Sequence, residues 1–330
     1  MKGYILGIES TAHTFSASIV SSSGRILSDV RDVYVAEEGQ GIHPFKSAEH
    51  HRENAASVVA QAFSLASLKP SEIDAVGYSM GPGLGPCLRV GAFTARVLSV
   101  SLKKPIVPVN HALGHIELGC LLTGARDPLV LLVSGGHTML LYFSSSRWRV
   151  IGETLDITLG QLLDQFGRYT GLSSPCGSKI EEEASKSRRY IPLPYTVKGN
   201  DVSFSGILTE AKKIYDRGKR FEDICFSIQE TAFAMVSEAT ERALAFTEKK
   251  ELLVVGGVAA NARLSSMLRS ICKRHNAKFL VVPPRYSGDC GAQIAWTAYL
   301  LYSSGISVKP EEASVKQSWR LDTVEIPWRS

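Results

Sequence analysis

A pattern of three short apolar segments joined by two polar turns occurs twice in this 330-residue chain, with the second copy about 125 residues after the first. The first copy comprises Tyr4–Glu9, Phe15–Val20 and Arg25–Ser28, and the second comprises Leu129–Val133, Met139–Phe143 and Trp148–Ile151. Short apolar segments bounded by Gly, Ser and Thr are typical of β-strands in hairpins. A repeat of this length predicts two structurally similar domains that face each other.

The turn after the first strand of each copy is rich in small residues. It contains Ser10 and Thr11 in the first copy, and Ser134, Gly135 and Gly136 in the second. Small residues let a backbone approach a ligand closely, so the two turns predict N–H groups that hold phosphate oxygens from opposite sides. Each turn taken alone is better explained as an ordinary hairpin, and only the pair favours a phosphate site.

The rest of the chain alternates between predicted strands and helices, which indicates an α/β fold. Strands are predicted near 73–80, 106–109, 252–255 and 279–282, and helices near 48–66, 88–102, 112–122, 263–274 and 292–301. We expect domains at 1–125 and 126–294. The second contains a helical insertion at about 156–247, and the segment 295–330 packs back on the first.

Paired glycines follow one of the later strands. Gly256 and Gly257 stand between a predicted strand and a predicted helix. This arrangement suits a nucleotide at the carboxyl end of a sheet, where a helix begins. The stretch lacks the GxGxxG pattern, so a dinucleotide-binding fold is disfavoured.

Two histidines, His111 and His115, lie four residues apart in a predicted helix. At this spacing they share one face, with Cβ atoms about 5–6 Å apart, which is close enough to bind one ion. Asp289, in a predicted loop, offers a carboxylate from a distant part of the chain. Two imidazoles and one carboxylate suit Fe(II) or Zn(II). Solvated or capping histidines show the same spacing, so this reading also stays open.

The composition is that of a globular protein, with 44% hydrophobic and 21% charged residues and a formal net charge of +5. Basic residues cluster at 186–189, 212–220 and 273–275, which suits either solvated helix faces or a surface for nucleic acid. The six cysteines form no C-x-x-C pair, which argues against a disulfide framework or a zinc knuckle. With no signal-peptide layout and no apolar run near the roughly 18 residues of a membrane helix, we expect a cytoplasmic protein without a membrane partner.

Four stretches together resemble the TsaD/OSGEP family of tRNA N6-adenosine threonylcarbamoyltransferases. They are Gly7–Thr14, His111–Glu117, Val133–Thr138, and Gly256–Asn261 with Gly288–Ala292, and the resemblance spans nearly the whole chain. It implies the fold of the ASKHA (actin-like ATPase) superfamily, which is α/β and has two RNase-H-like domains around a nucleotide cleft. Ser10–His13 and Ile42–Pro44 look more like the archaeal and eukaryotic branch, which works inside the KEOPS complex.

The resemblance also implies site residues. His111, His115 and Asp289 match the family's ligands for one divalent ion, Fe or Zn. The matching substrate-binding positions are Leu132, Val133, Ser134, Gly135, Gly136, Asp164, Gly177, Glu181 and Asn261. Many archaeal and eukaryotic relatives have a tyrosine ligand where this chain has Leu132, so here more coordination sites are left to water or substrate. By position, His13, Glu9 and Asp164 are candidates for accepting the N6 proton.

The implied reaction transfers the threonylcarbamoyl group from threonylcarbamoyl-AMP to N6 of adenosine 37 in tRNAs that read ANN codons, which makes the protein an acyltransferase. ATP or AMP is expected to bind the same cleft, and Mg²⁺ is a further candidate ion beside the nucleotide. Expected partners are tRNA and KEOPS subunits, including a small protein kinase and a small dimerising subunit. The kinase is expected to be a separate chain, because no kinase-like stretch is found in these 330 residues.

Three other functions compete with this one. An ASKHA small-molecule kinase would share the cleft, but it needs Mg²⁺, ATP and a catalytic carboxylate, and has no use for paired histidines. A metalloprotease would need the glutamate of H-E-x-x-H, and residue 112 is Ala. A non-catalytic scaffold of the complex would be expected to have lost the metal ligands, and all three are present.

Overall fold

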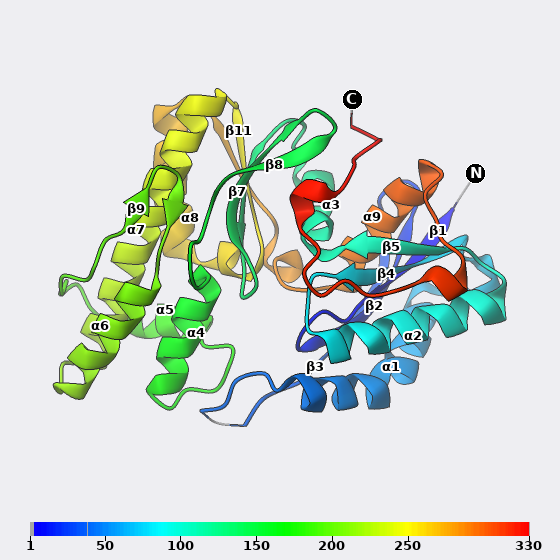
Figure 1. Ribbon diagram of the computed structural model, residues 1–330, viewed down its shortest axis with the longest axis horizontal. Helices are drawn as coiled ribbons and strands as arrows, with labels where there is room; N and C mark the ends of the chain where they lie inside the picture. Colours follow the sequence, from blue (N-terminus) through cyan, green and yellow to red (C-terminus); the bar gives the residue numbers. More distant parts are fainter. Residues whose placement is uncertain (1–2, 38, 330) are drawn as a thin grey trace.

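The first lobe of the protein is built on a five-stranded mixed sheet. In sheet order its strands are β3 (Ile26–Val33), β2 (Thr14–Ser21), β1 (Tyr4–Glu9), β4 (Ala75–Gly81) and β5 (Ile106–Asn110). Its helices are α1 (Pro44–Ala66), α2 (Gly85–Leu102) and α3 (His111–Thr123), with a single turn, η1 (Pro70–Glu72). The computed structural model describes residues 3–37 and 39–329 of the chain (Figure 1).

The second lobe repeats this sheet. In sheet order its strands are β8 (Arg147–Glu153), β7 (Thr138–Ser144), β6 (Leu129–Val133), β11 (Glu251–Val255) and β12 (Lys278–Val281). Both lobes pair an antiparallel three-stranded meander with two strands parallel to its first strand. The predicted repeat of hairpins is therefore a repeat of whole sheets, and the predicted two-lobed α/β fold is confirmed.

The remaining elements follow in chain order. They are α4 (Leu159–Tyr169), α5 (Gly177–Ser185), β9 (Val197–Lys198), β10 (Asp201–Val202), α6 (Ser205–Asp216), α7 (Phe221–Thr247), η2 (Gly257–Ala260), α8 (Ala262–Arg274), η3 (Pro284–Tyr286), α9 (Gly291–Ser303), η4 (Pro310–Glu312) and η5 (Leu321–Thr323). The short hairpin of β9 and β10 lies inside the segment predicted to be helical. None of the helices in the described ranges combines the length and hydrophobicity that crossing a bilayer requires.

Strand β6, at the centre of the second sheet, packs against a hydrophobic core on each face. Leu129 and Leu131 point into the core formed with α4 to α8, whereas Val130 and Leu132 point into a second core shared with α3 and the C-terminal tail. A strand buried on both faces is a continuous apolar run, as residues 129–133 are. In the first lobe, α1 and α2 cover one face of the sheet and α9 covers the other (Figure 1).

The helix α9 and the tail bring distant parts of the chain together. A Cβ on Gly7 would overlap the backbone of Gly291 and Ala295, so this glycine lets α9 lie directly on β1. The tail then crosses both lobes (Figure 1). Lys316 N–H donates to the Met80 carbonyl in the first lobe (2.8 Å), and Ile326 N–H donates to the Ser146 carbonyl in the second (2.9 Å). The proposed domain boundaries stay a prediction.

Two helices begin earlier than predicted. α2 starts at Gly85 rather than Leu88, because Pro86 occupies the first turn, where its missing N–H costs nothing. α1 starts at Pro44 rather than Ala48, with His43 Nδ1 accepting from Lys46 N–H (3.5 Å) as its cap. In the breaker-rich stretch 81–85, the turn runs from the end of β4 at Gly81 to the start of α2 at Gly85, and it lies against the tail, where a Cβ on Gly81 would overlap the Lys316 carbonyl.

Candidate metal centre

His111 and His115 stand on α3, a helix buried between the two sheets (Figure 1). The helix starts at His111 because the Asn110 side chain caps it by accepting from Leu113 N–H at 3.1 Å. It packs on α9 and β11, so both imidazoles are buried, with ring centroids 4.7 Å apart. The sequence-predicted spacing therefore places both rings on one side of a rigid, capped helix.

Asp289 approaches the same point from the start of α9. Gly291 N–H donates to Ser16 Oγ (2.8 Å), which holds this helix end on the first sheet. Asp289 Oδ1 lies 3.3 Å from His115 Nε2 and 3.5 Å from His111 Nε2. The structure thus brings the three predicted ligands together, with one donor atom from each within 4.8 Å of the others. In residues 3–37 and 39–329 no other group of His, Cys, Asp and Glu meets this spacing.

Glu9 lies behind His111. Its Oε2 atom accepts from His111 Nδ1 at 2.9 Å, and its Oε1 atom accepts from Thr11 N–H at 2.6 Å. In the neutral imidazole Nδ1 then carries the proton, so the lone pair of His111 is on Nε2, the atom that faces Asp289. Gln293 Nε2 also lies 3.2 Å from this Nδ1. Sequence reasoning named Glu9 as a candidate proton acceptor, and missed the contact with His111.

The electrostatics of the centre favour a cation. Burial opposes the charged form of Asp289, but His111 and His115 outweigh it and hold the pKa of that carboxyl far below its usual range. Burial also opposes protonation of His111, yet Glu9 and Asp289 raise the pKa of this imidazole to about 9. Burial, partly offset by the hydrogen bond with Asp289, lowers the pKa of His115. A site that holds a proton so tightly attracts a metal ion for the same reason.

The donor set fits a divalent ion. Two imidazole nitrogens and one carboxylate oxygen converge, and the second nitrogen of His111 is held by a carboxylate, as metal-bound histidines usually are. Three protein ligands leave positions open for substrate or water. Leu132, where the family resemblance implies a tyrosine ligand in many relatives, is fully buried in the apolar core around α3 and offers no donor.

His137 is a further histidine at this centre, and sequence reasoning gave it no role. Its ring stacks on that of His111, with centroids 6.4 Å apart and planes at 26°. Burial, together with His111 and His115, lowers its pKa to about 3. Its buried Nδ1 atom has no hydrogen-bond partner. His13, the other catalytic candidate, lies in the turn between β1 and β2, where its charge adds to the lowering of the Asp289 pKa.

The turn Ser134–Gly136 follows β6 and is tied to the start of α4. Thr158, the cap of α4, donates its hydroxyl to the Gly135 carbonyl at 2.9 Å. Ser134 Oγ accepts from the N–H groups of Gly136 and His137 at 3.2 and 3.0 Å. A Cβ on Gly135 or Gly136 would meet nothing within 4 Å, so the turn borders open space.

The other predicted substrate residues surround the starts of α5 and α8. Asp164 accepts from Ser174 Oγ (2.8 Å) and Cys176 N–H (3.1 Å), and its second oxygen accepts from Arg168 Nε (3.1 Å). The predicted pair of Asp164 with Arg168 is therefore present, and the carboxylate also shapes the loop before α5.

Glu181 and Asn261 lie on facing elements. Glu181 Oε1 accepts from Ala262 N–H (2.8 Å), which links α5 to the start of α8. Asn261 caps α8 and donates Nδ2 to Gln229 on α7 (2.7 Å). Gly177, the first residue of α5, borders open space like the glycines of the turn. The predicted substrate residues thus occur in two groups, one around the turn after β6 and one around α5 and α8.

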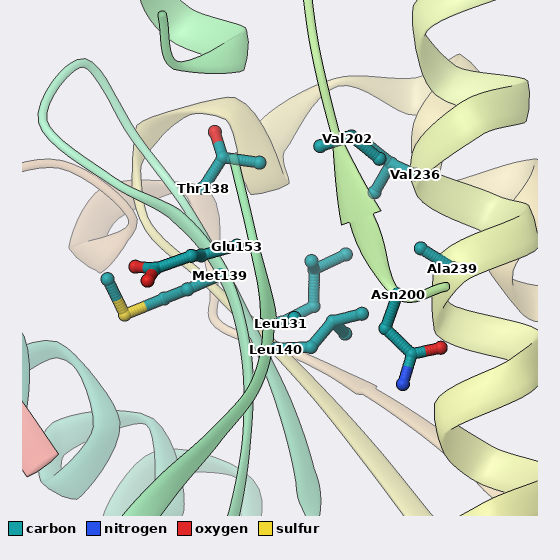
Figure 2. Close-up of a pocket in the computed structure, with 10 residues that line it drawn as sticks. Leu131, Thr138, Met139, Leu140, Glu153, Asn200, Val202, Val236 and Ala239 are labelled. Carbon is teal, nitrogen blue, oxygen red and sulfur yellow. The ribbon is translucent and has the colours of Figure 1, made fainter. Parts of the chain in front are cut away.

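A cavity beside β7 does not serve as the nucleotide site. Figure 2 shows its lining, which includes Leu131, Leu140, Val202, Val236 and Ala239. Its volume of about 10 Å³ holds about one water molecule. We therefore assign it to the core of the second lobe.

The TsaD family, described as tRNA N6-adenosine threonylcarbamoyltransferase, matches residues 25–296 of the chain. The enzyme of that name from Thermofilum pendens is 50% identical over 327 residues, covering 99% of this chain and 97% of the relative. The one from Caldivirga maquilingensis is 48% identical over 324 residues and covers 98% of each. A probable bifunctional tRNA threonylcarbamoyladenosine biosynthesis protein from Methanocaldococcus jannaschii is 48% identical and matches 98% of this chain, which spans 60% of that protein.

Solved structures support the fold alone, because their sequences are distant. HypF of T. kodakarensis superposes with a TM-score of 0.62 at 14% identity, over 92% of this chain and 48% of that one. Component A of (R)-2-hydroxyglutaryl-CoA dehydratase from Acidaminococcus fermentans gives 0.57 at 13% identity, over 90% and 98%. The predicted ASKHA fold is confirmed. The family model matches residues 25–296 and the relatives are 48% and 50% identical over nearly the whole chain, so this chain belongs to the TsaD family of tRNA N6-adenosine threonylcarbamoyltransferases, enzymes of t6A formation.

Proposed function

We propose that this chain is the catalytic subunit of a KEOPS-type complex, and that it carries out the family's transfer with one divalent ion held by His111, His115 and Asp289. The observation that carries this proposal is the convergence of three donor atoms from helix α3 and from the loop before α9, which are far apart in sequence. In the reaction, N6 of adenosine 37 bonds to the carbamoyl carbon as the bond from this carbon to the adenylate phosphate oxygen breaks. AMP leaves and N6 loses one proton.

When bound, the ion, Fe or Zn, supplies a Lewis acid that polarises the threonylcarbamoyl group, a contribution worth several kcal/mol. The residues of the chain hold the metal ligands in position. Glu9 sets the tautomer of His111, and the N-terminal position of His111 on a capped helix keeps its ring in place. Burial of both histidines excludes water that would hydrolyse the donor.

The adenylate part of the donor occupies the space between the turn Ser134–Gly136 and the start of α5. The N–H groups of Ser134 and Gly136 already donate within the turn, so the Gly135 N–H would be the one to donate to a phosphate or carbamoyl oxygen. Glu181 and Asn261 would hold the adenosine, together with Gly177 and Asp164, while Leu132 and Val133 place the turn from the core. ATP or AMP would bind the same space, with Mg²⁺ beside the phosphates.

The buried position of Glu9 favours a supporting role over proton transfer. Its side chain has no exposure to solvent, and both oxygens accept hydrogen bonds from within the protein. A group that accepts a proton from substrate must come within hydrogen-bond reach of it. His13 is half-buried in the neighbouring turn, which leaves it as the remaining candidate on this side of the centre.

An exposed apolar face on α2 is evidence for a binding site for a protein partner. On α2 the side chains of Phe93, Val97 and Val100 share one face and are 66%, 47% and 63% exposed. Large apolar groups gathered on a surface commonly mark a protein interface. We propose that this face docks a small dimerising KEOPS subunit, that the protein kinase of the complex is a separate chain, and that the assembly acts on tRNA in the cytoplasm.

The proposal is tested by supplying threonine, bicarbonate, ATP, a threonylcarbamoyl-adenylate synthase and tRNA, with and without candidate partner proteins. Nucleoside analysis should reveal t6A only when this chain is present. A parallel reaction without tRNA, monitored for phosphoryl transfer to small molecules, tests the rival kinase activity. Phosphoryl transfer without t6A would overturn the proposal.

A further inference from the structure

A cavity of about 280 Å³ lies next to the metal centre, between the second lobe and the C-terminal tail. Three parts of the chain line it: the turn and strand of β7 with β8, Pro82 of the first lobe, and the tail residues 318–322. Its volume is near the lower end of small-molecule sites, which are about 300–1,000 Å³. None of the donor-binding residues around α5 and α8 contributes to its lining.

The tail side of the cavity includes one aromatic residue, Trp319, which is hydrogen-bonded to the cap of α3. Trp319 is half-buried, and its carbonyl accepts from Asn110 Nδ2 at 3.2 Å. Asn110 is the residue that caps α3, directly before His111. On the opposite side, the lining includes Gly136 and His137, whose ring stacks on that of His111. Two residues of the lining, Trp319 and His137, therefore contact the cap of α3 and the ring of the candidate ligand His111.

The charges around the cavity are balanced. Arg320 Nη2 lies 3.0 Å from Asp322 Oδ2 and 3.6 Å from Glu153 Oε1. Figure 2 shows Glu153 and Met139 directed away from the small core cavity lined by Leu131 and Leu140. One guanidinium paired with two carboxylates does not attract a phosphate, but it offers donors and acceptors to an uncharged polar ring.

A cation lies just outside this lining. Lys316 Nζ lies over one face of the Trp319 ring, 5.3 Å from its centre, and the lysine is exposed. An exposed lysine can move off the ring, which then offers a stacking surface to an unpaired base while the ammonium group neutralises a neighbouring phosphate. The polar side chains in the lining and the lysine outside it therefore suit an unstacked nucleic-acid base.

We infer that this cavity receives the acceptor adenine of the tRNA anticodon loop, which stacks on Trp319 and presents its amino group to the threonylcarbamoyl donor held at the metal centre. The inference rests on the proposed function. It gives acceptor and donor separate sites on two sides of the turn Ser134–Gly136. An enzyme that modifies a base needs such a pocket, because the reacting amino group must leave the stacked loop.

The position of the base is tested by photo-cross-linking. An anticodon stem-loop with 8-azidoadenosine at position 37 is bound to the full-length protein, together with its accessory proteins, irradiated and digested. Cross-links are expected in peptides that contain residues 136–154 or 318–322. Cross-links confined to the segments around α5 and α8 would overturn the inference. Because this experiment needs binding alone, it gives an answer even if no transfer is observed.

Kinetics of variants provide the second test. Trp319→Ala should raise the KM for tRNA by about 5- to 150-fold, the loss expected from one base–aromatic stack, with a much smaller change in the KM for the adenylate donor. Trp319→Phe should restore most of the affinity for tRNA. Glu311→Ala, an exposed substitution in the same tail, is the matched control. An unchanged KM for tRNA in a folded Trp319→Ala protein would overturn the inference, whereas absence of t6A with wild-type protein would contradict the proposed function instead.

Discussion

The Nδ1 atom of His111 lies 2.9 Å from Oε2 of Glu9, although the two residues are 102 positions apart in the chain. Strand β1 and helix α3 are thereby joined at the metal centre. The bond determines which nitrogen of His111 is free to bind an ion, because an imidazole that donates from Nδ1 keeps its lone pair on Nε2. Glu9 is the residue through which the first sheet orients a metal ligand.

Glu9→Gln is expected to weaken metal affinity about 10- to 100-fold, the usual effect of altering the partner of a ligating histidine. Glutamine still accepts one hydrogen bond, so the fold should persist, but the negative charge that favours the cation is lost. Metal affinity is measured by titration of the apoprotein with Zn²⁺ or Fe²⁺. Glu49→Gln, exposed on α1, is the matched control. Equal affinities for the two variants would contradict this role of Glu9.

Gly7→Ala is expected to destabilise the protein by about 3 kcal/mol or more, because the added methyl group overlaps backbone atoms of α9 that cannot move independently. Gly206→Ala, in the first turn of α6, would meet the Pro194 side chain at an ordinary 3.6 Å and should leave stability unchanged or slightly raised. Urea unfolding of both variants measures the difference. Similar stability of both variants would show that α9 does not depend on this close approach.

Because the pKa of buried His51 is lowered, we expect the protein to lose stability in mild acid. Burial, partly offset by a hydrogen bond with the Ala12 carbonyl, lowers its pKa from 6.5 to about 4. The unfolded chain then binds a proton that the folded chain does not, so stability is complete above pH 6.5 and falls as the pH drops towards 4. The loss is about 3 kcal/mol over this window.

Urea unfolding of wild-type protein and His51→Gln at several pH values isolates this contribution. The variant should lose less stability than wild type between pH 6.5 and 4, because its side chain at this position does not titrate. Other groups titrate equally in both proteins and cancel in the comparison. Parallel stability profiles for the two proteins would show that His51 is not held neutral in the folded state.

Asp164→Asn is expected to raise the KM for the adenylate donor about tenfold, the effect of losing about 1.4 kcal/mol of binding. The carboxylate accepts from Ser174 and Cys176 and so shapes the loop that leads into Gly177 and α5. Asp216→Asn, which affects only an exposed bond with Tyr169, is the control. An effect on the KM for tRNA rather than for the donor would contradict the assignment.

Much of the fold could be predicted from the sequence because the signals are local. The hairpin repeat at Tyr4 and Leu129 and the buried run 129–133 follow directly from hydrophobic patterning. The pairing of the strands in the two sheets could not be derived this way, because parallel pairing joins segments distant in sequence. The first turn of α2, residues 85–87, does not follow from the pattern, because glycine and proline usually break helices but are tolerated in a first helical turn.

The ligands could be predicted, but their surroundings could not. His111 and His115 carry a spacing signal, Asp289 was proposed as a carboxylate from a distant loop, and the family resemblance implies the same three ligands. The contacts of Glu9 and His137 with His111 depend on tertiary packing and leave no mark in local sequence. At the basic cluster 273–275, Arg274 and His275 pair with Glu241, which agrees with the solvated helix face that was one of the two sequence-based interpretations.

The most direct test of the central claim is a single-turnover transfer from preformed threonylcarbamoyl-adenylate to tRNA, with metal content determined for each protein. Metal-depleted wild-type protein, His111→Ala and Asp289→Asn should all lose transfer by about 100-fold or more, in proportion to the several kcal/mol that a Lewis acid supplies. Adding Fe²⁺ or Zn²⁺ should restore transfer by the metal-depleted wild-type protein but not by the two variants. Wild-type transfer rates from a folded, metal-free His111→Ala protein would contradict the account.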